Sequence, residues 1–287
     1  MQRFVNVFFK MVMFVSCFFI DCSADDFSFF NEYNHYSESE IEKIRLMGER
    51  CSGTTYIHGL LVNNFPSQHV VAPKKHFLPW FNLNAFNIPK KSKEVEDLNF
   101  LEKLTDSCLL VLVVRDPYDW LRSFYSHPWH VKGDKMLHKG FLHFLQHEWR
   151  PSDKQMDYVG VDHWNPYNQR RFRNVLELRK YITLNYLQIG VLSKNFLVVR
   201  YEDVARNPQD FIRFISENFN IQSANQFTNV LTYKNENKKN YRATKYDPFK
   251  LEEFLFINKN IDWNVEKLIG YEKVERLKVI NRRDVVK

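Results

Sequence analysis

A short glycine-containing segment has the composition of an anion-binding loop. Gly48 to Thr55 reads Gly-Glu-Arg-Cys-Ser-Gly-Thr-Thr and lies between an apolar run and a helical pattern. Its glycines let backbone amides turn toward an anion, and the start of a helix adds unpaired N–H groups and a positive dipole end. A nucleotide triphosphatase has Lys and then Ser or Thr after the second glycine, whereas Thr54 stands here. We expect a phosphate cradle unlike a standard ATPase or GTPase loop; the alternative is a glycine turn without a ligand.

A guanidinium and a hydroxyl that could share one phosphate follow the most apolar run of the chain. Arg115 comes directly after Cys108–Val114, and Ser123 lies on the helix expected to begin at Pro117. The planar fork of an arginine binds phosphate oxygens in pairs, and a hydroxyl adds a further hydrogen bond. The alternative is a surface ion pair between Arg115 and Asp119.

Together these two segments resemble the nucleotide-binding signatures of sulfotransferases that use 3'-phosphoadenosine 5'-phosphosulfate (PAPS). The resemblance implies that the first segment holds the 5'-phosphosulfate and the second holds the 3'-phosphate. It extends to Arg200–Pro208 and to Ile257–Tyr271, which is similar to the C-terminal helix of the family. The residues that it assigns to the nucleotide are Arg50, Cys51, Ser52, Gly53, Thr54, Thr55, Arg115, Ser123 and Tyr201.

One position departs from the family pattern. The family usually has Lys or Arg directly before Ser-Gly-Thr, where it neutralises charge on the oxygen between phosphate and sulfate, and this chain has Cys51 there. We expect Arg50 to supply the charge from the neighbouring position, with Lys74 or Lys75 as the substitute. If none of them reaches, the protein would bind the nucleotide without turning it over.

A basic segment after the second apolar run carries the candidate proton acceptor. Residues 74–79, Lys-Lys-His-Phe-Leu-Pro, are similar to the segment with the base histidine in cytosolic sulfotransferases. Because an imidazole titrates near neutral pH, we expect His76 to take the proton from the acceptor, with Lys75 beside it as a catalytic cation. The alternatives are a merely packed or surface histidine and, as the base, Glu49 in the loop.

Short apolar runs alternate with helical patterns along the chain, which predicts an α/β fold with a central parallel sheet of four or five strands flanked by helices. The resemblance makes this a P-loop-like nucleotide-binding fold. The expected strands are Lys43–Met47, Gln68–Ala72, Cys108–Val114 and Asn195–Val199. The expected helices are Thr54–Asn63, Pro117–Ser126, Asn174–Leu192 and Pro208–Phe219, with Asp116 and Asn207 as N-caps before a proline.

The candidate residues share one place in this fold. The loop at 48–55, His76, Arg115 and Arg200 each follow an expected strand at its carboxyl end. Parallel α/β sheets bind ligands at that edge. If the strands are adjacent and parallel, these residues line one crevice.

Other charged and aromatic groups remain open in function. By the resemblance, Lys238, Lys239 and Arg242 close over the nucleotide; a solvated charge run is the alternative. Four further arginines could contact an anionic acceptor: Arg170, Arg171, Arg173 and Arg179. An irregular region with three tryptophans could shape a pocket for sugars or phenols: Trp129, Trp149 and Trp164.

We expect no metal site. His143 and His147 have helical i, i+4 spacing, but Cys ligands are absent nearby and Glu148 lies outside the His-Glu-x-x-His pattern. Sulfuryl transfer requires no metal.

The composition describes one large domain with a positive charge. The 287 residues are 44% apolar, 16% aromatic and 26% charged, which excludes a collagen, a coiled coil and a disordered tail. Lys and Arg number 41 against 34 acidic residues, so the formal charge is +7 and an anionic partner fits. The basic residues are spread along the chain without a zinc-finger pattern, so we expect no nucleic acid.

The first residues have the layout of a secretory signal peptide. Arg3 and Lys10 precede the apolar stretch Met11–Ile20, and Ala24 offers a cleavage site. We expect cleavage after Ala24 or, alternatively, an uncleaved anchor through residues 4–20, the only membrane attachment. The domains are then a leader at 1–24, a connector at 25–42 and a sulfotransferase domain at 43–287, in the secretory pathway: the Golgi lumen or outside the cell, or the periplasm of a bacterium.

The sequence therefore predicts an enzyme that moves the sulfuryl group from PAPS to a hydroxyl or amine and leaves adenosine 3',5'-bisphosphate. The acceptor is a carbohydrate, a protein tyrosine or a small molecule. The alternatives are a catalytically impaired nucleotide- or glycan-binding secreted protein and a P-loop nucleotide kinase that uses magnesium and ATP.

Overall fold

The computed structural model of the chain describes residues 31–37, 39–72, 76, 106–128, 131, 139–151, 164–165, 167–231 and 246–277. The leader and Lys74, Lys75, Lys238, Lys239 and Arg242 lie outside these residues. Within them, Cys51 and Cys108 are both free, so no bridge joins the two. None of the described helices combines the length and the apolar character needed to cross a bilayer.

A parallel sheet of four strands forms the centre of the described fold, in the order β2-β1-β3-β4. The strands are β1 (Lys43–Gly48), β2 (His69–Val71), β3 (Cys108–Val114) and β4 (Asn195–Arg200). The middle strand β3 reads Cys-Leu-Leu-Val-Leu-Val-Val and is buried along its whole length, because helices cover both of its faces. The α/β fold with a central parallel sheet is thereby confirmed.

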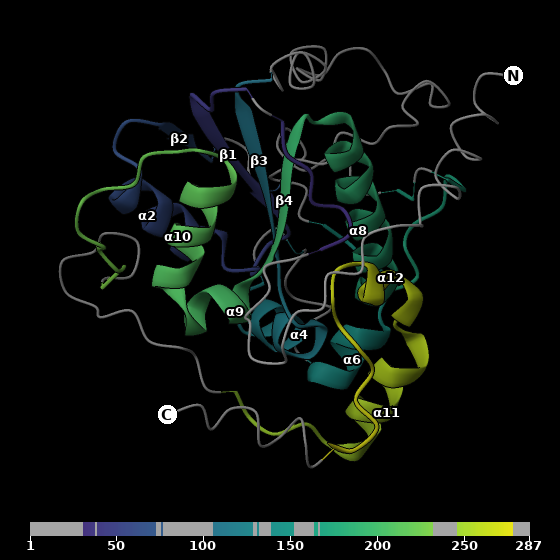
Figure 1. Ribbon diagram of the computed structural model, residues 1–287. Helices are drawn as coiled ribbons and strands as arrows, with labels where there is room; N and C mark the ends of the chain where they lie inside the picture. Colours follow the sequence, from purple (N-terminus) through teal and green to yellow (C-terminus); the bar gives the residue numbers. More distant parts are fainter. Residues whose placement is uncertain are drawn as a thin grey trace, which may run out of the picture.

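Helices pack on both faces of the sheet (Figure 1). One face, with Leu109 and Val111 of β3, packs on α2 (Thr54–Asn64) and α10 (Pro208–Asn218). The other face, with Leu110 and Leu112, packs on α8 (Val175–Leu192) and on the elements beside it. The elements beside α8 are α4 (Pro117–Ser126), α6 (Phe141–Gln146), α11 (Leu251–Asn260) and α12 (Trp263–Leu268). The short helix α9 (Tyr201–Arg206) directly follows β4.

The register of the sheet brings the carboxyl ends of β1, β3 and β4 to the same edge. Gly48 of β1 pairs with Val113 of β3, and Val114 pairs with Arg200 of β4. The loop after β1, the turn after β3 and the start of α9 therefore leave the sheet at one edge, where α4 and α9 lie (Figure 1).

The C-terminal segment differs from the expectation of one helix over Ile257–Tyr271. The chain leaves the helical conformation at Ile261, and the Asp262 side chain accepts hydrogen bonds from the amides of Asn264 and Val265, so that it starts α12 anew. Asn207 occupies the N-cap position of α10 as expected, but its side chain makes no capping hydrogen bond.

Candidate active site

The loop between β1 and α2 is tightly folded against its neighbours. Cys51 and Gly53 have φ angles of 62° and 92°, so the backbone is left-handed at both positions. A Cβ atom on Gly48 would lie 2.5 Å from the Val113 carbonyl oxygen, and one on Gly53 would lie 2.2 Å from a ring carbon of Tyr201. Both places require glycine, because no larger residue leaves room for β3 and for the Tyr201 ring.

The start of α2 presents hydrogen-bond donors at this loop. Gly53 caps the helix without a side-chain bond, and the first turn contains no acidic residue. The Ser52 side chain is 1% exposed, and its hydroxyl has no hydrogen-bond partner in the described part of the chain. An uncapped helix start and an unsatisfied buried hydroxyl are donors that fit an anionic phosphate or sulfate group.

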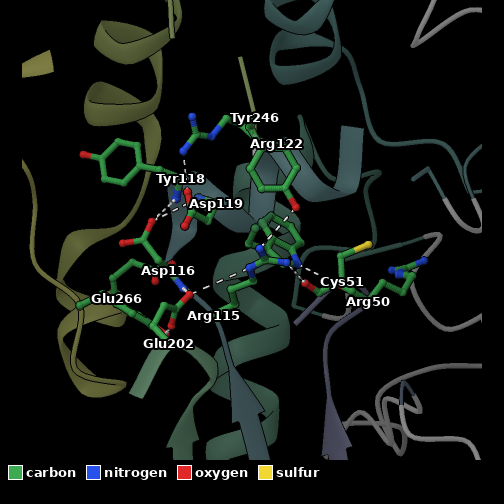
Figure 2. Close-up of polar contacts among 12 residues, drawn as sticks. Arg50, Cys51, Arg115, Asp116, Tyr118, Asp119, Arg122, Glu202, Tyr246 and Glu266 are labelled. Carbon is green, nitrogen blue, oxygen red and sulfur yellow. Dashed lines mark hydrogen bonds and ion pairs between the residues drawn. The ribbon is translucent and has the colours of Figure 1, made fainter. Parts of the chain in front are cut away.

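Arg115 extends from the end of β3 into the same loop (Figure 2). Its Nη1 donates a hydrogen bond of 3.0 Å to the Cys51 carbonyl, and its Nη2 donates one of 3.3 Å to the Tyr246 hydroxyl. Nε lies 4.0 Å from Oε1 of Glu202, and the guanidinium carbon lies 5.0 Å from the centre of the Tyr201 ring. The guanidinium thus contacts the loop directly.

Ser123 completes this group on α4. It is buried, and its side chain lies close enough to the Cys51 thiol to lower the pKa of that thiol against the larger effect of burial. The expected partners Arg115 and Ser123 therefore both lie against Cys51. The alternative ion pair of Arg115 with Asp119 is not formed, because Asp119 binds Arg122 at 2.6 Å.

The Cys51 side chain faces α4 rather than a charged group. Its Sγ donates to the His127 carbonyl at 3.7 Å, and burial raises the pKa of the thiol to about 11. The thiol is therefore neutral near pH 7 and brings no charge to the loop.

Arg50, expected to replace the missing cation, is almost fully buried, with 2% of its side chain exposed. Its Nε donates to Oε1 of Glu49 at 2.8 Å, and its guanidinium carbon lies 5.4 Å from the Phe124 ring and 5.2 Å from the Trp149 ring. Figure 2 shows this guanidinium directed away from Arg115. The positive charge of Arg50 is thus partly balanced by its own neighbour in the chain.

His76 lies beside the first residue of the loop, Gly48. Its Nδ1 is 2.7 Å from the Gly48 carbonyl oxygen. Because a carbonyl oxygen can only accept, Nδ1 carries the hydrogen, and the neutral ring then has its basic lone pair on Nε2.

At the carboxyl end of β4, Tyr201 rather than Arg200 lies at the loop. Tyr201 packs on Gly53 and under the Arg115 guanidinium. Arg200 instead binds Asp203 and donates to the Gly270 carbonyl at 2.8 Å. The structure therefore brings together the loop, His76, Arg115, Ser123 and Tyr201.

Sequence reasoning missed the buried groups that hold the backbone at Arg115 and Asp116 in place. Arg179, which we considered for an anionic acceptor, is buried; it binds both carboxylate oxygens of Glu266 and donates to the Arg115 carbonyl at 2.8 Å. Glu202 accepts from the Asp116 amide at 2.9 Å and from the Tyr271 hydroxyl at 2.8 Å, and burial raises its pKa. An arginine inside the apolar stripe of a helix was the available signal for Arg179, since such a charge needs a buried partner.

Among the described residues, His143 on α6 and His147 directly after it belong to no larger group of metal-binding side chains. His143 and His147 have ring centres 5.1 Å apart, and the described residues contain no cluster of three or more His, Cys, Asp or Glu side chains that could hold a metal.

The comparisons with known proteins point to one family. A family model described as a sulfotransferase domain matches residues 42–285 of this chain. No curated protein matches the chain.

Proposed function

Because this chain belongs to the sulfotransferase family, we propose that it transfers the sulfuryl group of PAPS to a hydroxyl or an amine and releases adenosine 3',5'-bisphosphate. One observation carries the proposal: Arg115 donates a hydrogen bond to the Cys51 carbonyl. This contact joins the residues expected at the two phosphate ends of the nucleotide in one place at the sheet edge, as ligand sites of parallel α/β sheets require.

PAPS supplies the activated sulfuryl group, and the donors around the loop fit its two anionic ends. The amides of Gly53 and Thr54 and the Ser52 hydroxyl would hold the 5'-phosphosulfate at the start of α2. Arg115 and Ser123 would hold the 3'-phosphate, with the Tyr201 ring beside them. Lys238, Lys239 and Arg242 stay proposed nucleotide contacts.

His76 is proposed to accept the proton of the acceptor group at Nε2. Its hydrogen bond to Gly48 supports this role, because the bond fixes the ring beside the loop and leaves Nε2 as the basic nitrogen. Lys75 stays proposed as the cation next to it. The chain would act mainly by holding the reacting groups in line and by placing donors where negative charge grows.

The position of Arg50 favours a second candidate function. A guanidinium that is paired with Glu49 and packed on Phe124 and Trp149 is poorly placed to neutralise a departing phosphate. With Cys51 neutral as well, the chain could bind the nucleotide and acceptor without transfer. Measured turnover separates the two functions.

Binding is tested by thermal unfolding with adenosine 3',5'-bisphosphate. The nucleotide should raise the Tm of the wild-type protein, because a ligand of the native state stabilises it. Arg115→Ala and Ser123→Ala should remove most of the shift, whereas Arg213→Ala, in an exposed pair with Asp210 on α10, should keep it. A response to ATP and magnesium with none to the bisphosphate would favour the kinase alternative instead.

Turnover is tested by transfer of labelled sulfuryl groups from PAPS to panels of carbohydrates, tyrosine peptides and phenols. His76→Ala should abolish transfer while the affinity for the bisphosphate survives; retained transfer would remove His76 from this role. Nucleotide binding without any transfer by the wild-type protein would establish the second candidate function.

The leader bears on the cell compartment in which the protein encounters its acceptor. We expect residues 1–24 to direct the chain into the secretory pathway, so that its acceptors are those of the Golgi lumen, the cell exterior or a bacterial periplasm. N-terminal sequencing of the mature protein should begin at Asp25; a protein that starts at Met1 would indicate the anchor.

A further inference from the structure

The guanidinium of Arg115 is enclosed by its partners. Only 13% of its side chain is exposed. Nη1 is bonded to the Cys51 carbonyl, Nη2 is bonded to the Tyr246 hydroxyl, and Nε faces Glu202. The Tyr201 ring covers it at 5.0 Å. A phosphate that binds at Nη1 or Nη2 of Arg115 must therefore compete with the Cys51 carbonyl or with the Tyr246 hydroxyl.

Three of the four neighbours are tied to the surrounding structure by the backbone, by hydrogen bonds or by packing. The Cys51 carbonyl belongs to the loop backbone, and the Glu202 carboxylate is held by the Asp116 amide and by the Tyr271 hydroxyl. Tyr201 is packed against Gly53. None of these can leave without changing the loop or the junction of β3 and α4.

Tyr246 differs from these three groups in the length of its contact with Arg115. Its neutral hydroxyl makes the longer of the two hydrogen bonds to Arg115, 3.3 Å against 3.0 Å. Its ring lies 5.8 Å from the Arg115 guanidinium carbon and 5.2 Å from that of Arg122. Arg122 in turn is held by Asp119 at 2.6 Å and donates to the Asp247 carbonyl at 3.2 Å, so the ring is kept between two cations. Figure 2 shows Tyr246 above Arg115, on the side away from the strand.

We infer that Tyr246 is a 3'-phosphate-sensing residue, whose hydroxyl occupies the phosphate position on Arg115 and is exchanged for a phosphate oxygen when nucleotide binds. This inference rests on the proposed function and deepens it by naming the contact that the nucleotide must break. A charged phosphate oxygen outcompetes a phenol hydroxyl for a guanidinium, since hydrogen bonds between ionised groups are the stronger ones. The hydroxyl therefore weakens binding of nucleotides with a 3'-phosphate and leaves those without one unaffected.

Calorimetry on the full chain tests this inference with a variant that lacks only the hydroxyl oxygen of Tyr246. Tyr246→Phe should lower the Kd of adenosine 3',5'-bisphosphate about threefold to tenfold, because one competing hydrogen bond is lost. The Kd of adenosine 5'-monophosphate, which lacks the 3'-phosphate, should stay unchanged. Tyr181→Phe is the matched control and should change neither affinity. The Tyr181 ring lies on α8 and packs on Tyr167 and Phe172, which precede that helix.

A double-mutant cycle identifies the partner. In an Arg115→Ala background the Tyr246→Phe change should have no effect on the bisphosphate, because the contested group is gone. An unchanged or higher Kd in Tyr246→Phe, or an equal gain for both nucleotides, would overturn the inference while the proposed function stands. Failure of the wild-type protein to bind the bisphosphate would overturn both.

Discussion

At the scale of single residues, Cys51 shows how a replaced side chain changes the character of a loop. The thiol lies between Ser123 and the His127 carbonyl and is desolvated there, and the resulting high pKa keeps it neutral. A lysine or arginine at this position would add a cation beside Arg115. The substitution thus removes charge from the site and adds a small apolar contact with α4.

The raised pKa predicts the reactivity of this thiol. Alkylation of Cys51 by iodoacetamide should be slow near neutral pH and rise about tenfold per pH unit up to a pH of about 11, because only the thiolate reacts. Peptide mapping by mass spectrometry measures this for Cys51 separately, with free cysteine as the reference that levels off near its ordinary pKa of about 8.5.

Adenosine 3',5'-bisphosphate should slow the same reaction, since Cys51 contacts both proposed 3'-phosphate ligands. Cys108, which is 1% exposed in β3, should stay unmodified throughout and reports that the fold is intact. A rate that levels off near pH 9, or a rate that the nucleotide leaves unchanged, would contradict this description of the site.

At the scale of elements, the loop after β1 depends on Gly53 for two reasons, backbone conformation and space, and Gly140 before α6 allows the two to be separated. Gly53 and Gly140 both have positive φ angles, 92° and 93°, and each caps a helix. A Cβ atom on Gly53 would overlap the Tyr201 ring, whereas one on Gly140 would meet nothing within 4 Å. Only Gly53 therefore combines backbone strain with a steric conflict at the site.

We predict that Gly53→Ala lowers the affinity for the bisphosphate about tenfold or more, because the Tyr201 ring must move away from the loop and from Arg115. Gly140→Ala should cost about 1–3 kcal/mol of stability from its backbone conformation alone and leave the affinity unchanged. Urea unfolding and calorimetry on both variants give the two quantities. Equal losses of affinity would show that the ring contact is unimportant.

The elements themselves were largely predictable. Cys108–Val114 and Pro117–Ser126 form β3 and α4 within the predicted bounds, because an apolar run buried on both faces and a capped proline start are strong local signals. The short α9 was not predicted, since its six residues are too few to show a helical period. The break before α12 was readable in Asp262, a capping residue in the middle of the segment taken as one helix.

The site was predictable at the strand ends and not beyond them. The topology alone places the loop, His76 and Arg115 at one edge, because parallel strands end together. The direction of the Arg50 side chain depends on how Phe124 and Trp149 pack, and these residues are distant in sequence. Side-chain packing between remote segments has no local signal.

At the scale of the whole molecule, the C-terminal helix α12 supports the site through α8. Glu266 holds Arg179, and Arg179 donates to the Arg115 carbonyl at the end of β3. Tyr271 reaches the same junction from the other side through Glu202 and the Asp116 amide. The turn from which Arg115 extends is thus fixed by residues far along the chain, since Tyr271 comes 156 positions after Arg115.

Two ion pairs between α8 and the α12 region allow this support to be measured. Arg179 and Glu266 are 5% and 3% exposed, whereas the adjacent pair Lys180 and Asp262 is 34% and 28% exposed. Glu266→Gln leaves a buried arginine without its counter-charge and should lower the free energy of unfolding by about 3–5 kcal/mol. Asp262→Asn makes the same chemical change at the surface and keeps a capping side chain, so it should cost less than about 1 kcal/mol.

The same two variants separate support of the site from general stability. Glu266→Gln should also weaken bisphosphate binding at temperatures where the variant is fully folded, because the Arg115 carbonyl loses its anchored donor and the guanidinium on the same residue shifts with it. Asp262→Asn should bind like the wild-type protein. If Glu266→Gln lost stability but bound the nucleotide normally, α12 would be a stabilising element without influence on the site, and the coupling across the molecule would be refuted.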